Sequence, residues 1–310
     1  MSDIRNRDAL PMRNKHKVND LIFYTLMVAF PLAQFCVFYI SVNINSILLA
    51  FRSYSSEDGG FVWAQFDNFV NIFSDFAASA TLKTAMLNSL LVWAASTAVS
   101  LPLAMLFSYY IYNKRPASGV FKTLLFLPSV IPGIAITVIY LYFVERAIPA
   151  FAADVCGITV EGLLQNPATR FGAIFFYNVF LSFGGNVILL LGGMNTVDPS
   201  VREAAYLDGA KGWCEFRHII LPKVWPTLTT FFVMGVASIF TNQFNLYNFY
   251  GIAASEKLAT MGYLLYARTS IATMADYPEL AATGLLLTAV IIPLTLLAKK
   301  MLEKFGPSED

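Results

Sequence analysis

The sequence has 310 residues, of which 57% are hydrophobic and only 13% are charged. This balance excludes an ordinary soluble globular domain and predicts a membrane protein. The net charge of +1 gives no reason to expect a nucleic-acid partner, and three scattered cysteines with two isolated histidines predict no disulfide framework and no metal site.

Six apolar runs are long enough to cross a bilayer as helices. A spanning helix needs about 20 mostly apolar residues, because its backbone groups must be paired internally where water is absent. The runs are Leu21–Phe51, Leu87–Tyr112, Thr123–Val144, Phe171–Asn195, Leu228–Tyr250 and Leu280–Leu297. None of them contains Asp, Glu, Lys or Arg. We therefore expect an all-α membrane protein with six transmembrane helices, the first of them an uncleaved anchor.

The basic residues predict the orientation. With the N-terminus inside, 15 of the 21 Lys and Arg residues fall on the inner side, whereas the acidic residues divide evenly between the two sides. Basic residues concentrate on the cytoplasmic side of membrane proteins. We therefore expect cytoplasmic tails at 1–20 and 299–310, an outer segment at 52–86, and a core at 87–298 that includes a cytoplasmic loop at 198–226.

The expected outer segment contains an amphipathic run. Between Phe61 and Phe76, aromatic and aliphatic residues recur at helical spacing among polar ones. The pattern is typical of a helix at the membrane interface and is equally compatible with a partner contact. Farther along, Pro102, Pro128 and Pro132 predict kinks in spans two and three.

Polar side chains gather in spans four and five, where we expect a substrate passage. The candidate lining residues are Asn178, Ser182, Ser238, Asn242, Phe244, Asn245 and Tyr247. On the helix expected for span five, Ser238, Asn242, Asn245 and Phe249 fall along one stripe. Amides in hydrocarbon need partners, either at a helix interface or in a wet cavity. Grouped amides beside aromatic rings favour a cavity for a polyhydroxylated solute, because amides bond hydroxyl groups in both directions and rings cover the apolar faces of sugars.

The polar stretch Asp198–Pro226 predicts two short helices joined by a sharp turn. An aspartate followed by a proline suits the start of a helix, which is expected to run to Leu207. Gly209 then favours a left-handed break. A second helix is expected over Lys211–Ile220, with Pro222 ending it. Such a pair of helices at a membrane surface is a docking element.

Within Asp198–Pro226, particular residue types stand at fixed positions over more than twenty residues. The matching positions are Glu203, Ala204, Ala205, Gly209, Ile219, Leu221 and Pro222, extended by Asp208, Ala210, Phe216 and Pro226. In these residues the chain resembles the EAA loop of bacterial ABC importer permeases of type I, which work with a binding protein. Phe66–Phe69, Phe121–Thr123 and Leu127-Pro128 extend the resemblance over 61–298, most closely to first-subunit-type carbohydrate permeases. Gly251–Ser255 departs from the glycine-rich run usual in those permeases, which leaves the substrate class open.

The resemblance implies both a fold and a set of partners. The expected fold is that of a type I ABC permease, and the expected role is to form half of an alternating-access pathway in the cytoplasmic membrane for a small polar solute such as a sugar or oligosaccharide. The expected partners are a second homologous permease, two ATP-binding subunits, an extracytoplasmic solute-binding protein and membrane lipid. The EAA loop would dock on the ATP-binding subunit. This chain would then be no enzyme and would hold no cofactor, since ATP and Mg would be bound by its partner.

The alternative is a secondary transporter or channel that no ATPase drives. Such proteins generally need an ionisable group or a cation cage within the membrane, or a ring of charges or carbonyls as a filter. The predicted spans contain no acid or base and show no evident inverted repeat. A phosphate-binding GxxxxGK[ST] motif is absent from the sequence, so ATP would have to be bound by another subunit.

Overall fold

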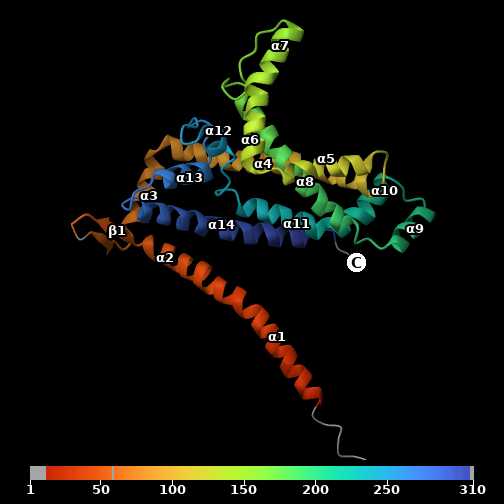
Figure 1. Ribbon diagram of the computed structural model, residues 1–310, viewed down its shortest axis with the longest axis horizontal. Coiled ribbons are helices and arrows are strands. Elements are labelled where there is room, and N and C mark those ends of the chain that lie inside the picture. The colour runs from red at the N-terminus through yellow and green to blue at the C-terminus, as the bar shows by residue number, and fades with distance from the viewer. Residues whose placement is uncertain (1–11, 58, 308–310) are drawn as a thin grey trace, which may run out of the picture.

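The computed structural model describes residues 12–57 and 59–307, so the outermost parts of both expected tails lie outside the described residues. Six helices in these ranges are long and apolar enough to cross a membrane, which confirms the predicted number of spans. Most long helices lie along one bundle, with the Asp198–Pro226 stretch, here called the EAA loop, at one end (Figure 1). A β-hairpin lies at the other end. We call these the loop end and the hairpin end.

The first span is an arm that leaves the bundle (Figure 1). It comprises α1 (Met12–Gln34), a π-helical turn η1 (Phe35–Ile40) and α2 (Ser41–Leu49). The helix begins at Met12, inside the expected tail 1–20, so the polar residues just before the apolar run form its first turns. None of the most apolar window of this span is buried in the protein. Its apolar surface therefore needs lipid or another subunit.

The hairpin end holds two strands and an amphipathic helix. They are β1 (Arg52–Ser55), antiparallel to β2 (Gly60–Trp63), and α3 (Asp67–Ala78). The helical pattern read from Phe61 onward is thus wrong for its first residues, which form a strand. Aromatic and β-branched residues suit a strand, and the turn at Gly59, with φ of +63°, closes the hairpin.

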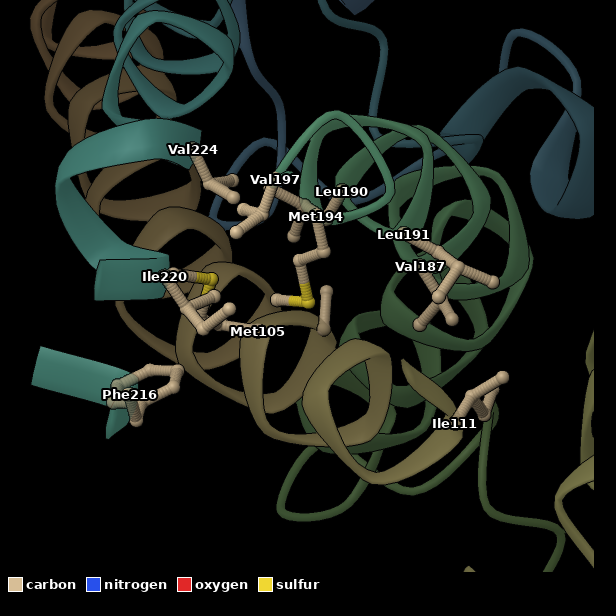
Figure 2. Packing of buried hydrophobic residues seen from close by; sticks show 11 residues of the cluster. Met105, Ile111, Val187, Leu190, Leu191, Met194, Val197, Phe216, Ile220 and Val224 are labelled. Carbon is tan, nitrogen blue, oxygen red and sulfur yellow. The ribbon is translucent and has the colours of Figure 1, made fainter. Parts of the chain in front are cut away.

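Four helices form the bundle: α4 (Ala80–Tyr112), α8 (Arg170–Met194), α11 (Leu221–Ala237) and α14 (Tyr277–Phe305). Pro102 lies inside α4 without interrupting it. Near the loop end, Met105 of α4, Met194 of α8 and Val224 of α11 belong to one buried apolar cluster (Figure 2). This cluster fixes the bundle next to the EAA loop.

The third span is broken, against the prediction of one helix over Thr123–Val144. Its pieces are α5 (Ser118–Val130), α6 (Gly133–Tyr142), a π-helical turn η2 (Phe143–Ala147) and α7 (Ile148–Cys156). Pro132 has no N–H, and the preceding Ile131 is extended, with φ of −80° and ψ of 134°. Figure 1 shows α6 and α7 as a second arm that turns away from the bundle. The candidate span Gly133–Cys156 therefore includes charged residues, Glu145 among them, that the predicted span left out.

The fifth span also ends early. Instead of one helix over Leu228–Tyr250, α11 stops at Ala237, and residues 238–245 are non-helical turns. The short helices α12 (Leu246–Tyr250) and α13 (Met261–Ile271) follow. Phe244 and Asn245 have φ of 54° and 55°, a left-handed conformation that no α-helix can contain.

Candidate functional site

The first helix of the EAA loop forms as the sequence predicts. It is α9 (Pro199–Leu207), with Asp198 as its N-cap: the backbone N–H of Ser200 donates to Asp198 Oδ1 at 2.9 Å. The Ser200 hydroxyl donates to the same oxygen at 2.8 Å. These two donors favour the ionised carboxylate and lower the pKa of Asp198.

The second helix of the EAA loop differs from the prediction. It begins at Trp213 as α10 (Trp213–Glu215), and Pro222 does not end it, because a π-helical turn η3 (Phe216–Ile220) continues directly into α11. The N–H of Leu221 donates to Phe216 O, five residues back instead of the usual four. The hydrogen-bond pattern has therefore already shifted by one residue before Pro222, which has no N–H to donate. Gly209, with φ of +85°, makes the predicted turn.

The matched EAA residues divide into an exposed and a packed group. Glu203, Ala204, Asp208 and Gly209 are exposed, while Ala205 and Ala210 are partly buried. In contrast, Phe216 is only 7% exposed and belongs to the core cluster of Figure 2. Ile219 and Leu221 pack against that cluster, and Pro222 is half-buried. The first half of the loop is therefore free to meet a partner, and the second half anchors it to the bundle.

The exposed half of the loop carries apolar side chains beside a hollow. Leu207 is 86% exposed and Tyr206 61% exposed, in helix α9, which buries none of its residues. The hollow next to them, of about 690 Å³, is lined in part by Glu203, Arg115 and Lys211. A large apolar residue at such exposure, beside charges of both signs, suits a protein contact.

Two charged residues that sequence reasoning missed connect the halves of the loop. Arg202 Nε lies 2.6 Å from Glu215 Oε1, and the Arg202 guanidinium also donates to Asn113 Oδ1 at the end of α4. The sequence contained a signal for this pair: Arg202 and Glu215 have opposite charges and lie on either side of the predicted turn at Gly209, and such a turn can bring them together.

The structure joins spans four and five through amides. Asn245 Nδ2 donates to Asn178 Oδ1 at 2.7 Å, and Asn248 Nδ2 donates to Asn245 Oδ1 at 2.8 Å. Asn178 Nδ2 in turn donates to the carbonyls of Ile174, at 2.8 Å, and Phe244, at 3.2 Å. This chain of amides holds the non-helical segment against α8. Asn178 and Asn245 thus make a packing contact between α8 and the non-helical segment, and packing is the alternative to a cavity that the sequence left open.

Two further features of the predicted passage are absent from the described part of the chain: the polar stripe on span five and an accessible Phe244. The helical stripe through Ser238, Asn242 and Asn245 does not exist, because the helix has ended before it. Phe244 is 1% exposed and packs against Phe171 with ring centroids 5.7 Å apart, so it belongs to the core of this chain.

The remaining passage residues lie nearer the surface. Asn242 is exposed, although its side-chain oxygen accepts from a backbone N–H at 2.8 Å. Ser182 on α8 is exposed as well and donates to Asn178 O at 3.0 Å. Ser238 and Tyr247 are half-buried, and the Tyr247 ring meets that of Tyr266 edge to face.

Comparison with known proteins places the chain in a family. Residues 100–308 match the family described as binding-protein-dependent transport system inner membrane component. The inner membrane ABC transporter permease protein YcjO of Escherichia coli is 26% identical over 77% of this chain and 80% of its own length. The sn-glycerol-3-phosphate permease protein UgpA of Yersinia pestis is 25% identical over 76% of this chain and 79% of its own length. The chain spans about half, 54%, of a probable ABC transporter permease of Mycoplasma pneumoniae, with 27% identity over 56% of this chain.

Solved structures share the fold. A bacterial ABC transporter that imports the acidic polysaccharide alginate has a chain with a TM-score of 0.76 at 19% identity, covering 96% of this chain and all of the other. The family match extends over more than half of the chain, and six candidate spans agree with it. The protein is therefore a multi-pass protein of the cytoplasmic membrane and belongs to the binding-protein-dependent transport system inner membrane components, the permease subunits of ABC importers.

Proposed function

We propose that this chain forms half of the translocation pathway of an ATP-driven importer and that its EAA loop docks on an ATP-binding subunit. The observation that carries the proposal is α9, a capped helix at one end of the bundle that buries none of its residues and exposes Leu207 and Tyr206 next to Glu203. Such a surface on a protein without its own phosphate-binding loop fits a contact with the subunit that binds ATP and Mg. On this assignment both termini and α9 face the cytoplasm.

The two arms support the need for a second permease. The first span buries none of its most apolar window, and the arm of α6 and α7 leaves the bundle. Between α5, α6 and α8 lies an apolar groove of about 370 Å³, lined by residues such as Leu127, Ile136 and Phe180. A homologous subunit that covers these faces would complete the pathway, and lipid would cover the rest. Two ATP-binding subunits and an extracytoplasmic solute-binding protein complete the proposed assembly.

The solute we propose is a sugar or oligosaccharide. Asn242 and Ser182 expose polar groups near the amide chain of Asn178, Asn245 and Asn248. Amides that face a wet passage bond hydroxyl groups as donors and as acceptors. A relative that handles sn-glycerol-3-phosphate and a structural neighbour that imports alginate both act on polyhydroxylated solutes. In the assembled importer, closure of the ATP-binding subunits would move α9 and open the passage alternately to each side.

The passage assignment is tested with the assembled complex in proteoliposomes. Asn242, the exposed amide, is replaced by leucine first, and Asn245, which also packs against Asn178, is replaced alone and in combination with it. Asn19→Leu, an exposed amide on the distant α1, is the matched control. Uptake of a panel of labelled mono- and oligosaccharides is measured separately from basal ATP hydrolysis. We expect lost uptake with retained hydrolysis. Loss of assembly would show that these amides only pack helices, and unchanged uptake would remove them from the passage.

A further inference from the structure

Helix α9 is attached to the rest of the protein almost without apolar packing. None of its residues is buried, and its last residue, Leu207, is 86% exposed. Apolar burial is usually what holds a short surface helix in place, since isolated helices of this length are not stable in water. A polar contact must therefore fix the position of α9 relative to the bundle.

Arg202 makes that contact. It is the residue of α9 with side-chain hydrogen bonds to other parts of the described chain: its Nε donates to Glu215 Oε1 at 2.6 Å, and a terminal nitrogen donates to Asn113 Oδ1. Its guanidinium carbon also lies 4.7 Å from the ring centroid of Tyr112. One side chain thus joins α9 to the second half of the EAA loop and to the end of α4.

Glu215 is held on both of its oxygens. The residue is 8% exposed, and its second oxygen, Oε2, lies 3.0 Å from the Tyr109 hydroxyl of α4. The same hydroxyl lies 2.9 Å from Gly212 O, so it bridges the loop and the helix. A buried carboxylate needs its cation and its donors, and loss of either partner leaves the other charge uncompensated.

The second half of the loop does not depend on this pair. Phe216, Ile220 and Val224 are buried in the apolar cluster shared with α4 and α8 (Figure 2). Loss of the charged pair would therefore leave α10 and α11 packed and release mainly α9. This separates a role in transmitting movement from a role in folding.

We propose that Arg202 and Glu215 are positioning residues for coupling: they lock α9 to the end of α4, so that a displacement imposed on α9 moves α4 with it. The inference rests on the proposed docking of α9 on an ATP-binding subunit. Without the pair, α9 would still meet its partner, but its movement would be lost in the turn at Gly209. It would not reach α4 or, through the apolar cluster that α4 shares with α8, the helix that carries Asn178 and Ser182 of the proposed passage.

The experiment uses spin labels in the assembled complex. In a background with Cys36, Cys156 and Cys214 replaced, labels are attached at Val201→Cys on α9 and at Leu106→Cys on α4, both exposed positions outside the proposed docking surface. The test variants are Arg202→Met, Glu215→Gln and their combination. The control is Arg217→Met, which removes an exposed charge from the same loop. Label distances are measured without nucleotide and with ATP trapped by vanadate.

We expect one narrow distance in both nucleotide states for the intact pair and for the control. The test variants should lose this single distance, shift on ATP trapping and import less sugar per ATP hydrolysed, while ATP-binding subunits co-purify as before. The double variant should import as much sugar per ATP hydrolysed as either single variant, because the two residues act as a unit. Unchanged distances in the variants would overturn the proposal, and so would loss of the ATP-binding subunits, which would make the pair part of the docking surface. If the protein with the Arg202–Glu215 pair unchanged never binds ATP-binding subunits, that result would instead refute the proposed function itself.

Discussion

Replacement of Gly262 by alanine tests how the non-helical segment after α11 is held. An ideal Cβ at Gly262 would lie 2.5 Å from the carbonyl carbon of Thr241 and 2.7 Å from that of Asn242. To reach an ordinary contact of 3.4 Å, one side must retreat by about 0.9 Å. The start of α13 resists this movement, because the N–H of Met261 donates to Ser89 Oγ on α4 at 2.9 Å. The displacement must therefore go into the segment 238–245.

The displacement also breaks a hydrogen bond. Thr260 Oγ1 donates to Asn242 O at 2.8 Å, and the added 0.9 Å would stretch this distance to about 3.7 Å, beyond hydrogen-bonding reach. Overpacking typically costs about 1–3 kcal/mol and a lost hydrogen bond about 1 kcal/mol. We expect Gly262→Ala to destabilise the chain by about 2–4 kcal/mol and to abolish uptake, because Asn242 moves out of place.

The assay is thermal melting of the purified protein in detergent, followed by sugar uptake by the assembled complex. Gly119→Ala is the matched control, since its added Cβ meets open space. The control should melt no lower than the original protein. A Gly262→Ala protein that melts and transports like the control would refute the close approach of α13 to the segment and the reasoning built on it.

Two further predictions concern the EAA loop. Gly209→Val places a β-branched residue at φ of +85°, which should cost about 1–2 kcal/mol of stability and uncouple ATP hydrolysis from uptake. Gly209→Asn is the control and should retain more coupling, because asparagine tolerates a left-handed backbone. Wild-type coupling in the valine variant would contradict this prediction. Glu203→Lys should weaken the stimulation of ATP hydrolysis by the loaded solute-binding protein without affecting membrane insertion. Unchanged stimulation would mean that Glu203 is only a solvated surface charge.

Local signals were sufficient for the first half of the EAA loop. An aspartate cap, a proline at the first helical position and a glycine at a left-handed turn act within a few residues, and α9 forms between them as predicted. The count of spans was predictable for a similar reason, since length and hydropathy alone decide whether a helix can cross a bilayer.

Proline positions could not be interpreted from the sequence alone. Pro102 and Pro128 lie inside α4 and α5, Pro132 separates two helices, and Pro222 lies just after a π-helical turn in a helix that continues. The outcome depends on whether the neighbouring backbone shifts its hydrogen bonds, and the residue type does not reveal this.

The end of the fifth span depends on contacts distant in sequence. Residues 238–250 carry no charge and enough aliphatic and aromatic residues to look like a continuing helix, but the hydrogen bond from Thr260 and the close approach of Gly262 hold the backbone of residues 241–242 in another conformation. The pairing of Asn178 with Asn245 likewise joins α8 to a segment 67 residues later. Neither contact leaves a periodic signal within the span.

Site-specific photo-crosslinking from α9 tests the central claim most directly. A crosslinking amino acid is placed at Leu207, which is 86% exposed on α9, and at Phe73, 63% exposed on α3 at the hairpin end, in a complex that is active in ATP-dependent uptake. We expect position 207 to crosslink to an ATP-binding subunit and position 73 to give no such product. An active complex in which position 207 yields no crosslink to an ATP-binding subunit, or in which position 73 yields one, would contradict the account.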